Sequence, residues 1–347
     1  MLGRQADLFL APLERPPVIW SWGVGVDSTA GIIEMHARGE PIDMVLTAHM
    51  PERQATFAFR DKFIAWMDER GIPNTICQYH PKRFKNWPPY RDLAENCITN
   101  CTLPSIAYGR SGCSLKAKVL PMETWAEGWQ PAMQAWAQGL KVVKCIGYDA
   151  GGRDSARYAH AEGKEDPLYE YRYPLREWGW DRKTCEDRIF SELGMVPPKS
   201  SCTFCTASKM HEIDALNPTE LWIIVLIEAR AAPRNRTVEG LWRKATKGAR
   251  GGPARPGSMT EYIVQKGLLP PDEVKRVVAE CPTGQIATKD IREDRPISEH
   301  PERAAWTRFM ARNGHLFEGN GLGPLYGEEY AAQLRRDIAR LNEEERA

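Results

Sequence analysis

No apolar run in this 347-residue sequence approaches the roughly 20 residues that a transmembrane helix requires. The opening residues, MLGRQADLFLAPLERPP, lack the long apolar core of a secretory signal. The sequence also has no internal repeat and no marked excess of charge, with 47 Lys and Arg against 46 Asp and Glu. We therefore expect a cytoplasmic globular protein with no membrane partner, and we exclude a repeat architecture.

Cysteine, in contrast, is not scarce. The sequence contains nine cysteines. Because the cytosol keeps thiols reduced, we do not expect these residues to form a disulfide framework. Metal ligation, catalysis and core packing are the remaining roles.

The balanced total charge hides one basic segment. Between Arg230 and Arg255 the sequence has eight Lys or Arg residues and one acid, Glu239. With its Gly and Pro content, the stretch predicts a flexible loop at about 230–258. Such a loop suits contact with the phosphate backbone of DNA or RNA, although a solvated surface loop can have the same composition.

Alternating strand and helix patterns fill the first part of the chain. Short apolar runs predict strands, and longer segments with a helical apolar face predict helices. They follow one another as a strand at 17–22, a helix at 28–40, a strand at 42–50, a helix at 54–71, a strand at 74–79, a strand at 141–149 and a helix at 183–194. This order is typical of a doubly wound α/β fold with a parallel sheet. We expect that domain at residues 1–215 and a mainly helical appendage at 216–347.

The stretch SWGVGVDST, residues 21–29, joins the first predicted strand to the first predicted helix. Free backbone N–H groups and the helix dipole favour an anion at such a turn. Glycine lets the backbone approach a ligand closely, and hydroxyl groups add donors to phosphate oxygens. The candidate nucleotide-binding residues are Ser21, Gly23, Gly25, Asp27, Ser28 and Thr29.

Three kinds of nucleotide loop compete for this stretch. The Walker loop ends in Gly-Lys-Ser/Thr, and no Lys occurs here. The dinucleotide loop needs a third small residue where Ser28 stands and an acid at the end of the next strand, which reads TAHM. The third kind is the Ser-Gly-Gly-x-Asp-Ser loop of ATP pyrophosphatases, which holds the β,γ-pyrophosphate while the α-phosphorus is attacked.

The loop resembles the variant found in the phosphoadenosine phosphosulfate (PAPS) reductase-like branch of the ATP pyrophosphatase superfamily. Further motifs follow in the order of that family. CSLKAKVLP supplies Cys113, Lys118 and Pro121, and GYDAGGRDSARY supplies Gly147, Asp154 and Arg157. YPLREWGW and the cysteine pair in SSCTFC complete the series, so the resemblance covers about residues 18–210.

This resemblance implies a sheet of the HUP or PP-loop type that binds ATP and Mg²⁺ at its carboxyl edge. It implies catalytic roles for Asp27, Lys118 and Arg157, of which the two cations would offset the charge of the leaving pyrophosphate. Gly147 would lie at the nucleotide. His49 stands where many relatives have Asp, and we expect it to contact adenine or ribose.

The cysteine pair Cys202 and Cys205 has the spacing at which two thiolates reach one metal or cluster. Cys113 and Cys185 lie beside family-like motifs, which implies a site of four thiolates. The resemblance favours a [4Fe–4S] cluster, with structural zinc as the alternative. Cys97 and Cys101 are reserve ligands, and for the other three cysteines, Cys77, Cys145 and Cys281, core packing is the better expectation.

The sequence thus predicts an enzyme that adenylates a substrate with ATP, releasing pyrophosphate. By analogy with DNA phosphorothioation systems, it would act as a sulfurtransferase toward DNA or RNA, supplied by a sulfur donor such as a cysteine desulfurase. One alternative is an oxidoreductase, a sulfonucleotide reductase with a thiol donor. The nucleophilic cysteine that PAPS reductases carry near their C-terminus in an E-C-G-x-H context has no match, because the last cysteine here is Cys281 in AECPTG. Another is a non-catalytic nucleic-acid-binding protein.

Overall fold

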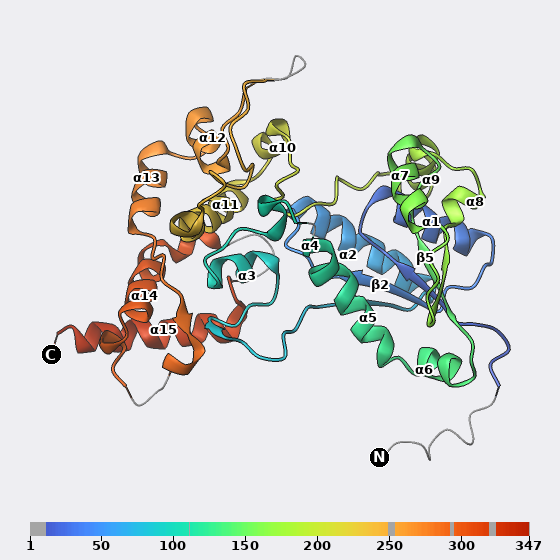
Figure 1. Ribbon diagram of the computed structural model, residues 1–347, viewed down its shortest axis with the longest axis horizontal. Coiled ribbons are helices and arrows are strands. Elements are labelled where there is room, and N and C mark those ends of the chain that lie inside the picture. Colours follow the sequence, from blue (N-terminus) through green and yellow to red (C-terminus); the bar gives the residue numbers. More distant parts are fainter. Residues whose placement is uncertain (1–11, 111, 249–253, 292–294, 319–323, 347) are drawn as a thin grey trace. The chain divides into compact units, whose positions relative to one another are not determined.

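The computed structural model describes residues 12–110, 112–248, 254–291, 295–318 and 324–346, without the side chain of Arg153 (Figure 1). The chain divides into two compact units, each built from separate segments. Unit 1 comprises Met1–His49, Ala55–Gln78 and Lys118–Ser200, and unit 2 comprises Met50–Gln54, Tyr79–Ala117 and Ser201–Ala347. This division differs from the single boundary that we expected near residue 215, because residues 79–117 and 201–215 belong to the same unit as the C-terminal third.

Unit 1 contains a five-stranded, all-parallel sheet in the order β3-β2-β1-β5-β6. The strands are β1 (Val18–Ser21), β2 (Met44–Ala48), β3 (Asn74–Cys77), β5 (Val142–Ile146) and β6 (Tyr169–Arg172). Ser21 at the end of β1 is in register with Leu46 of β2 and Ile146 of β5, so these three strands reach the same edge together. The predicted α/β class with a parallel sheet is confirmed.

Helices cover both faces of this sheet (Figure 1). On one face, Val18 and Trp20 of β1 pack with α1 (Val26–Ala37), α2 (Gln54–Glu69), α8 (Pro174–Glu177) and α9 (Arg182–Leu193). On the other face, Ile19 packs with α5 (Leu120–Glu127) and α6 (Gln130–Ala137). Successive residues of a strand point to opposite faces, which explains why all three β1 residues are buried. Helix α7 (Gly152–Ala161) also belongs to unit 1.

Unit 2 is mainly helical, with one short antiparallel pair of strands, β4 (Asn86–Trp87) and β7 (Ile286–Ala287). Helix α11 (Pro218–Ala231) is buried nearly all round and forms the centre of its core. Its other α-helices among the described residues are α3 (Leu93–Thr99), α4 (Gly112–Ser114), α10 (Met210–Asp214), α12 (Met259–Lys266), α13 (Pro271–Glu280), α14 (Pro301–Asn313) and α15 (Gly327–Glu344). Within the described residues, no helix is both long and apolar enough to cross a membrane.

Candidate functional site

The loop after β1 has an unusual backbone conformation. Val24 has a φ of 56°, in the left-handed region that β-branched residues rarely adopt. Its side chain is buried in the apolar cluster around β1 and α1, which anchors the loop. Gly25 is the N-cap of α1 with an ordinary φ of −102°. The left-handed position is therefore the valine between the two glycines that the sequence motif singled out.

Side chains of the loop connect it to the first turn of α1. The indole Nε1 of Trp22 donates to Thr29 Oγ1 at 2.9 Å, and this hydroxyl donates to the Gly25 carbonyl at 2.7 Å. The Gly23 amide donates to Ser28 Oγ at 3.2 Å. Thr29, which we expected to face phosphate, is fully buried with its hydroxyl engaged inside the loop. Its place in the structure makes it a residue that holds the loop in shape.

The loop lines a pocket of about 450 Å³ in unit 1. A Cβ atom on Gly23 or Gly25 would meet no atom within 4 Å, so the loop offers bare backbone there. Gly147, which follows β5, approaches the loop so closely that a Cβ atom on it would lie 2.6 Å from the Ser28 amide nitrogen. Strand order reverses between β1 and β5, and open parallel sheets bind their ligands at such a point.

Three aspartates meet at this pocket. Asp27 lies in the first turn of α1, Asp149 follows β5, and Asp154 lies in the first turn of α7. One oxygen of each carboxylate lies within 4.8 Å of the other two, and among the described residues this is the only such group of three His, Cys, Asp or Glu. Asp149 and Asp154 are buried. Carboxylate oxygens of this kind are the protein ligands that Mg²⁺ prefers, so the donor set fits that ion.

The ionisation of Asp27 is shifted by its surroundings. Burial raises its pKa to about 6, the Arg182 guanidinium opposes that rise, and the charges of Asp149 and Asp154 add to it. Arg182 Nη1 lies 3.2 Å from Asp27 Oδ2. A carboxylate whose charge is disfavoured in this way gains from binding a cation, which supplies the missing counter-charge.

Six of the predicted site residues line the pocket, namely Gly23, Gly25, Asp27, Ser28, Gly147 and Arg157. The exposed side chain of Arg157 forms an ion pair with Asp154 at 3.0 Å. Sequence reasoning missed Asp149, Arg182, Lys199 and Ser200, which also line it. Asp149 had a usable signal, because an acid just after a parallel strand lies at the ligand edge of the sheet.

The other predicted nucleotide contacts lie outside the lining of this pocket. His49 follows β2, where its amide donates to the Cys77 carbonyl at 2.7 Å and its ring lies 6.4 Å from that of Phe57. Lys118 is half-buried in a π-helical turn, Leu115–Val119. The hydroxyl oxygen of Ser21 is buried without a hydrogen-bond partner among the described residues. The structure therefore places Gly147 and Arg157 at one pocket with the loop residues Gly23–Ser28, and the lining of that pocket does not include these three residues.

The predicted four-cysteine set is divided between the units. Cys185 lies on α9 in unit 1, fully buried in the apolar cluster between that helix and the sheet. Burial raises the pKa of its thiol. Cys113, Cys202 and Cys205 belong to unit 2. The environment of Cys185 is that of a packed core residue rather than an open thiolate.

Cys97, which we held as a reserve ligand, lies near two of the three. Burial raises its pKa well above the ordinary value, and the nearby thiols of Cys113 and Cys202 contribute to that rise. Cys97 and Cys113 line a second pocket of about 520 Å³ that also includes Lys116. The Cys113 sulfur lies 3.2 Å from Ser105 Oγ. Unit 2 thus gathers three cysteines around one region, with Cys205 three residues along the chain from Cys202.

The spacing of these cysteines bears on what they can hold. Four thiolates on one tetrahedral zinc ion, each about 2.3 Å from the metal, lie roughly 4 Å apart. Among the described residues, no three cysteine sulfurs lie within 4.8 Å of one another. An iron–sulfur cluster spaces its thiolates more widely, because each one binds a different iron. Four thiolates are a donor set for either group, so the preference for a cluster comes from the sequence resemblance.

Part of the basic segment lies in the core of unit 2. Arg230 is buried, donates to the Ile98 carbonyl at 3.0 Å and lies over the Trp306 ring. Arg234 donates to the Thr283 carbonyl at 2.8 Å. Part of the expected flexible loop, residues 249–253, lies outside the described residues. Arg230 therefore holds unit 2 together and is not available for a nucleic-acid backbone, whereas Arg234 is exposed.

Neither a protein-family model nor a curated protein matches the sequence.

Proposed function

We propose that this chain is an ATP pyrophosphatase that adenylates an acceptor, as a step in sulfur transfer to a nucleic acid. The observation that carries the proposal is the pocket at the carboxyl end of β1, where bare loop backbone faces three converging aspartates. Backbone N–H groups at a strand-to-helix turn bind phosphate oxygens. The carboxylates cannot bind phosphate directly, so their presence beside such a turn indicates a cation between the two.

In this proposal the β,γ-phosphates of ATP lie against Gly23, Gly25 and Ser28. A nucleophilic oxygen of the acceptor forms a bond to the α-phosphorus as the bond from that phosphorus to the bridging oxygen breaks, and pyrophosphate leaves. Arg157 and Arg182, which line the pocket, offset the charge of the leaving group. Mg²⁺ held by Asp27, Asp149 and Asp154 would add positive charge at the same phosphates.

The adenylated acceptor is then open to attack by a sulfur nucleophile, which displaces AMP. We assign the thiolate site of unit 2 to Cys97, Cys113, Cys202 and Cys205, in place of the set that included Cys185. A [4Fe–4S] cluster bound there would supply a site for sulfur or electron handling. The electrostatic contacts of Cys97 with Cys113 and Cys202 support this choice.

The test is to incubate the full chain, purified without oxygen, with ATP and Mg²⁺ and to measure pyrophosphate and AMP. We expect release that increases when an acceptor oligonucleotide is added and is lost in Asp27→Asn. Asp187→Asn is the matched control, because Asp187 lies on the exposed side of α9 and pairs with Lys183. Sulfite release from PAPS with a thiol donor, without pyrophosphate from ATP, would instead identify a sulfonucleotide reductase.

A further inference from the structure

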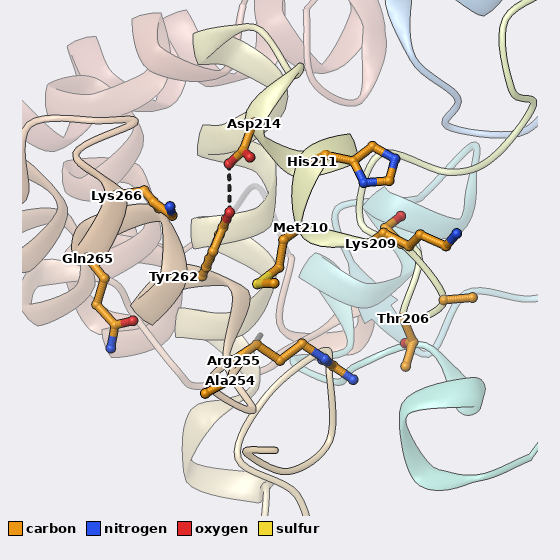
Figure 2. A pocket seen from close by; sticks show the side chains of 12 residues that line it. Thr206, Lys209, Met210, His211, Asp214, Ala254, Arg255, Tyr262, Gln265 and Lys266 are labelled. Carbon is orange, nitrogen blue, oxygen red and sulfur yellow. Dashed lines mark hydrogen bonds between the residues drawn. The ribbon is translucent and has the colours of Figure 1, made fainter. Parts of the chain in front are cut away.

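Unit 2 contains a larger pocket that the proposed ATP chemistry does not use (Figure 2). Its volume is about 950 Å³, and its walls come from the segment Thr206–Asp214, from Ala254 and Arg255, and from α12. Four of its lining residues carry or can carry positive charge, Lys209, His211, Arg255 and Lys266. Its only acid is Asp214, whose carboxylate accepts a hydrogen bond from the Tyr262 hydroxyl at 2.8 Å.

The walls of this pocket hold polar atoms that lack partners. Thr206 Oγ1, Ser208 Oγ and Arg255 Nη1 are buried without a hydrogen-bond partner among the described residues. Ser208 is only 6% exposed. Leaving a buried polar group unpaired costs about 1–3 kcal/mol. Three such donors at one pocket point to a ligand rich in acceptor oxygens.

Arg255 is fixed in its position. Its backbone pairs with Thr246 in both directions, and its guanidinium lies 4.8 Å from the Trp242 ring centroid. In Figure 2 the guanidinium points toward the side of the pocket where Thr206 and Lys209 lie. Burial lowers the pKa of this group, but an arginine remains charged at neutral pH. A held guanidinium beside hydroxyl groups is a common arrangement for recognising phosphate.

The pocket has a buried floor and a charged, exposed rim. Ser208 and Tyr262 are buried, whereas Lys209, His211 and Lys266 are exposed. A polymer can enter and leave an open rim of this kind while one of its units lies on the floor. The volume is near the upper end of the range of small-ligand pockets, which is more than one phosphate needs. These features favour a nucleic-acid strand over a free inorganic anion.

The pocket also adjoins the cysteine pair. The Cys205 amide donates to the Cys202 carbonyl at 3.1 Å, and the Ser208 amide donates to the Cys205 carbonyl at 2.8 Å. Two successive turns therefore lead from the pair to the pocket wall. We propose that this pocket binds the sugar–phosphate backbone of a single nucleic-acid strand and presents it beside Cys202 and Cys205. This inference rests on the proposed function, since it locates the acceptor of that reaction.

The experiment measures binding of fluorescein-labelled single-stranded DNA and RNA oligonucleotides, and of a duplex, to the full chain over a series of salt concentrations. Arg255→Gln should weaken binding of a single strand about tenfold or more, as expected for a lost charge-assisted hydrogen bond. Lys209→Gln should reduce the steepness of the plot of log affinity against log salt concentration by about one, which corresponds to one fewer counterion released on binding. Lys275→Gln is the matched control, because Lys275 is an exposed lysine on α13 outside the pocket.

Arg255→Gln could also weaken binding by unfolding the loop that carries it, so the thermal midpoint is measured in parallel. Lys209 is exposed, and its substitution provides a second variant that leaves the fold intact. Unchanged strand binding in both variants would overturn the inference. The inference would also be overturned if the wild type bound no oligonucleotide but bound phosphate or pyrophosphate in a way that Arg255→Gln abolished. Binding of duplex as tight as binding of a single strand would overturn it too. If ATP yields no pyrophosphate but strand binding depends on Arg255 and Lys209, the proposed function fails and the pocket assignment stands.

Discussion

At the scale of single residues, Gly25 and Gly147, which both line the loop pocket, should respond differently to substitution by alanine. A Cβ on Gly25 would enter open space, and its φ of −102° suits any residue. Gly25→Ala should therefore fold with a stability within about 1 kcal/mol of the wild type, because its smaller unfolded-state entropy opposes the weaker N-cap preference of alanine. Because the added methyl group lies where we place phosphate, it should raise the Kd for ATP at least tenfold. Calorimetry and a thermal melt together measure both effects.

Gly147→Ala is the comparison for that variant. Its Cβ would lie 2.6 Å from backbone at Ser28, which cannot move without displacing the first turn of α1. We expect it to lower the free energy of unfolding by about 1–3 kcal/mol, as overpacked sites do. If Gly25→Ala is as destabilising as Gly147→Ala, a Cβ on Gly25 meets other atoms, which contradicts the open space at the loop. If it leaves ATP affinity unchanged, the phosphates lie elsewhere.

The buried charge of Asp27 should lower the stability of the fold, although the proposed reaction needs it. Its pKa is raised to about 6, chiefly by burial, so in the pH range from about 4 to 6 the folded chain binds more protons than the unfolded chain. The free energy of unfolding should fall as pH rises through that range and level off above it. Asp27→Asn removes the buried charge and should gain about 1 kcal/mol or more at pH 7, while abolishing pyrophosphate release. Urea melts at pH 4.5 and 7 measure the first effect.

The same carboxylate predicts how magnesium binding depends on pH. A cation binds the ionised form of Asp27, so protons and Mg²⁺ compete for it. Mg²⁺ affinity, followed by titration calorimetry, should fall by up to tenfold for each pH unit below about 6 and change little above 7. Asp27→Asn should remove this dependence. A wild-type affinity that is flat between pH 5 and 7 would contradict the assignment of the cation to this group.

At the scale of secondary-structure elements, α1 approaches β1 so closely at Gly31 that no side chain fits there. A Cβ on Gly31 would lie 2.2 Å from the ring of Trp20, which is fully buried. Alanine improves helix propensity by about 1 kcal/mol, but the clash should outweigh it and lower stability by about 1–3 kcal/mol net. Gly152→Ala, at the start of α7 where a Cβ meets nothing within 4 Å, is the control. Thermal or urea melts that rank the two variants in reverse would refute this packing.

The elements show what sequence patterns can and cannot supply. Strands β1, β2, β3 and β5 and helices α1, α2 and α9 were predictable, because their apolar runs and helical faces are local signals. Burial of Cys185 was not predictable, since its neighbours in the core come from distant segments. The same holds for the approach of Cys97 to Cys202 and of Asp149 to Asp27. A short motif marks a turn, but tertiary packing decides which side chains meet there.

At the scale of the whole molecule, unit 2 depends on segments far apart in the sequence. The Thr99 hydroxyl donates to the Tyr326 hydroxyl oxygen across 227 residues, and the buried carboxylate of Glu95 accepts from the Tyr326 amide. Arg230 of α11 donates to Ile98 of α3. Closing such long loops costs entropy before the contacts form. The core of unit 2 is therefore complete only when residues 79–117 are present with the C-terminal third.

This dependence predicts how fragments behave. Residues 216–347 expressed alone lack α3 and the strand that pairs with β7, which leaves apolar faces of α11 and polar partners of Arg230 uncovered. We expect this fragment to retain helical circular dichroism but to melt without a cooperative transition. Joining residues 79–117 to 201–347 through a flexible linker should restore a cooperative transition, since that chain contains every segment of unit 2 except Met50–Gln54. A cooperative melt of 216–347 by itself would show that the C-terminal third folds without residues 79–117.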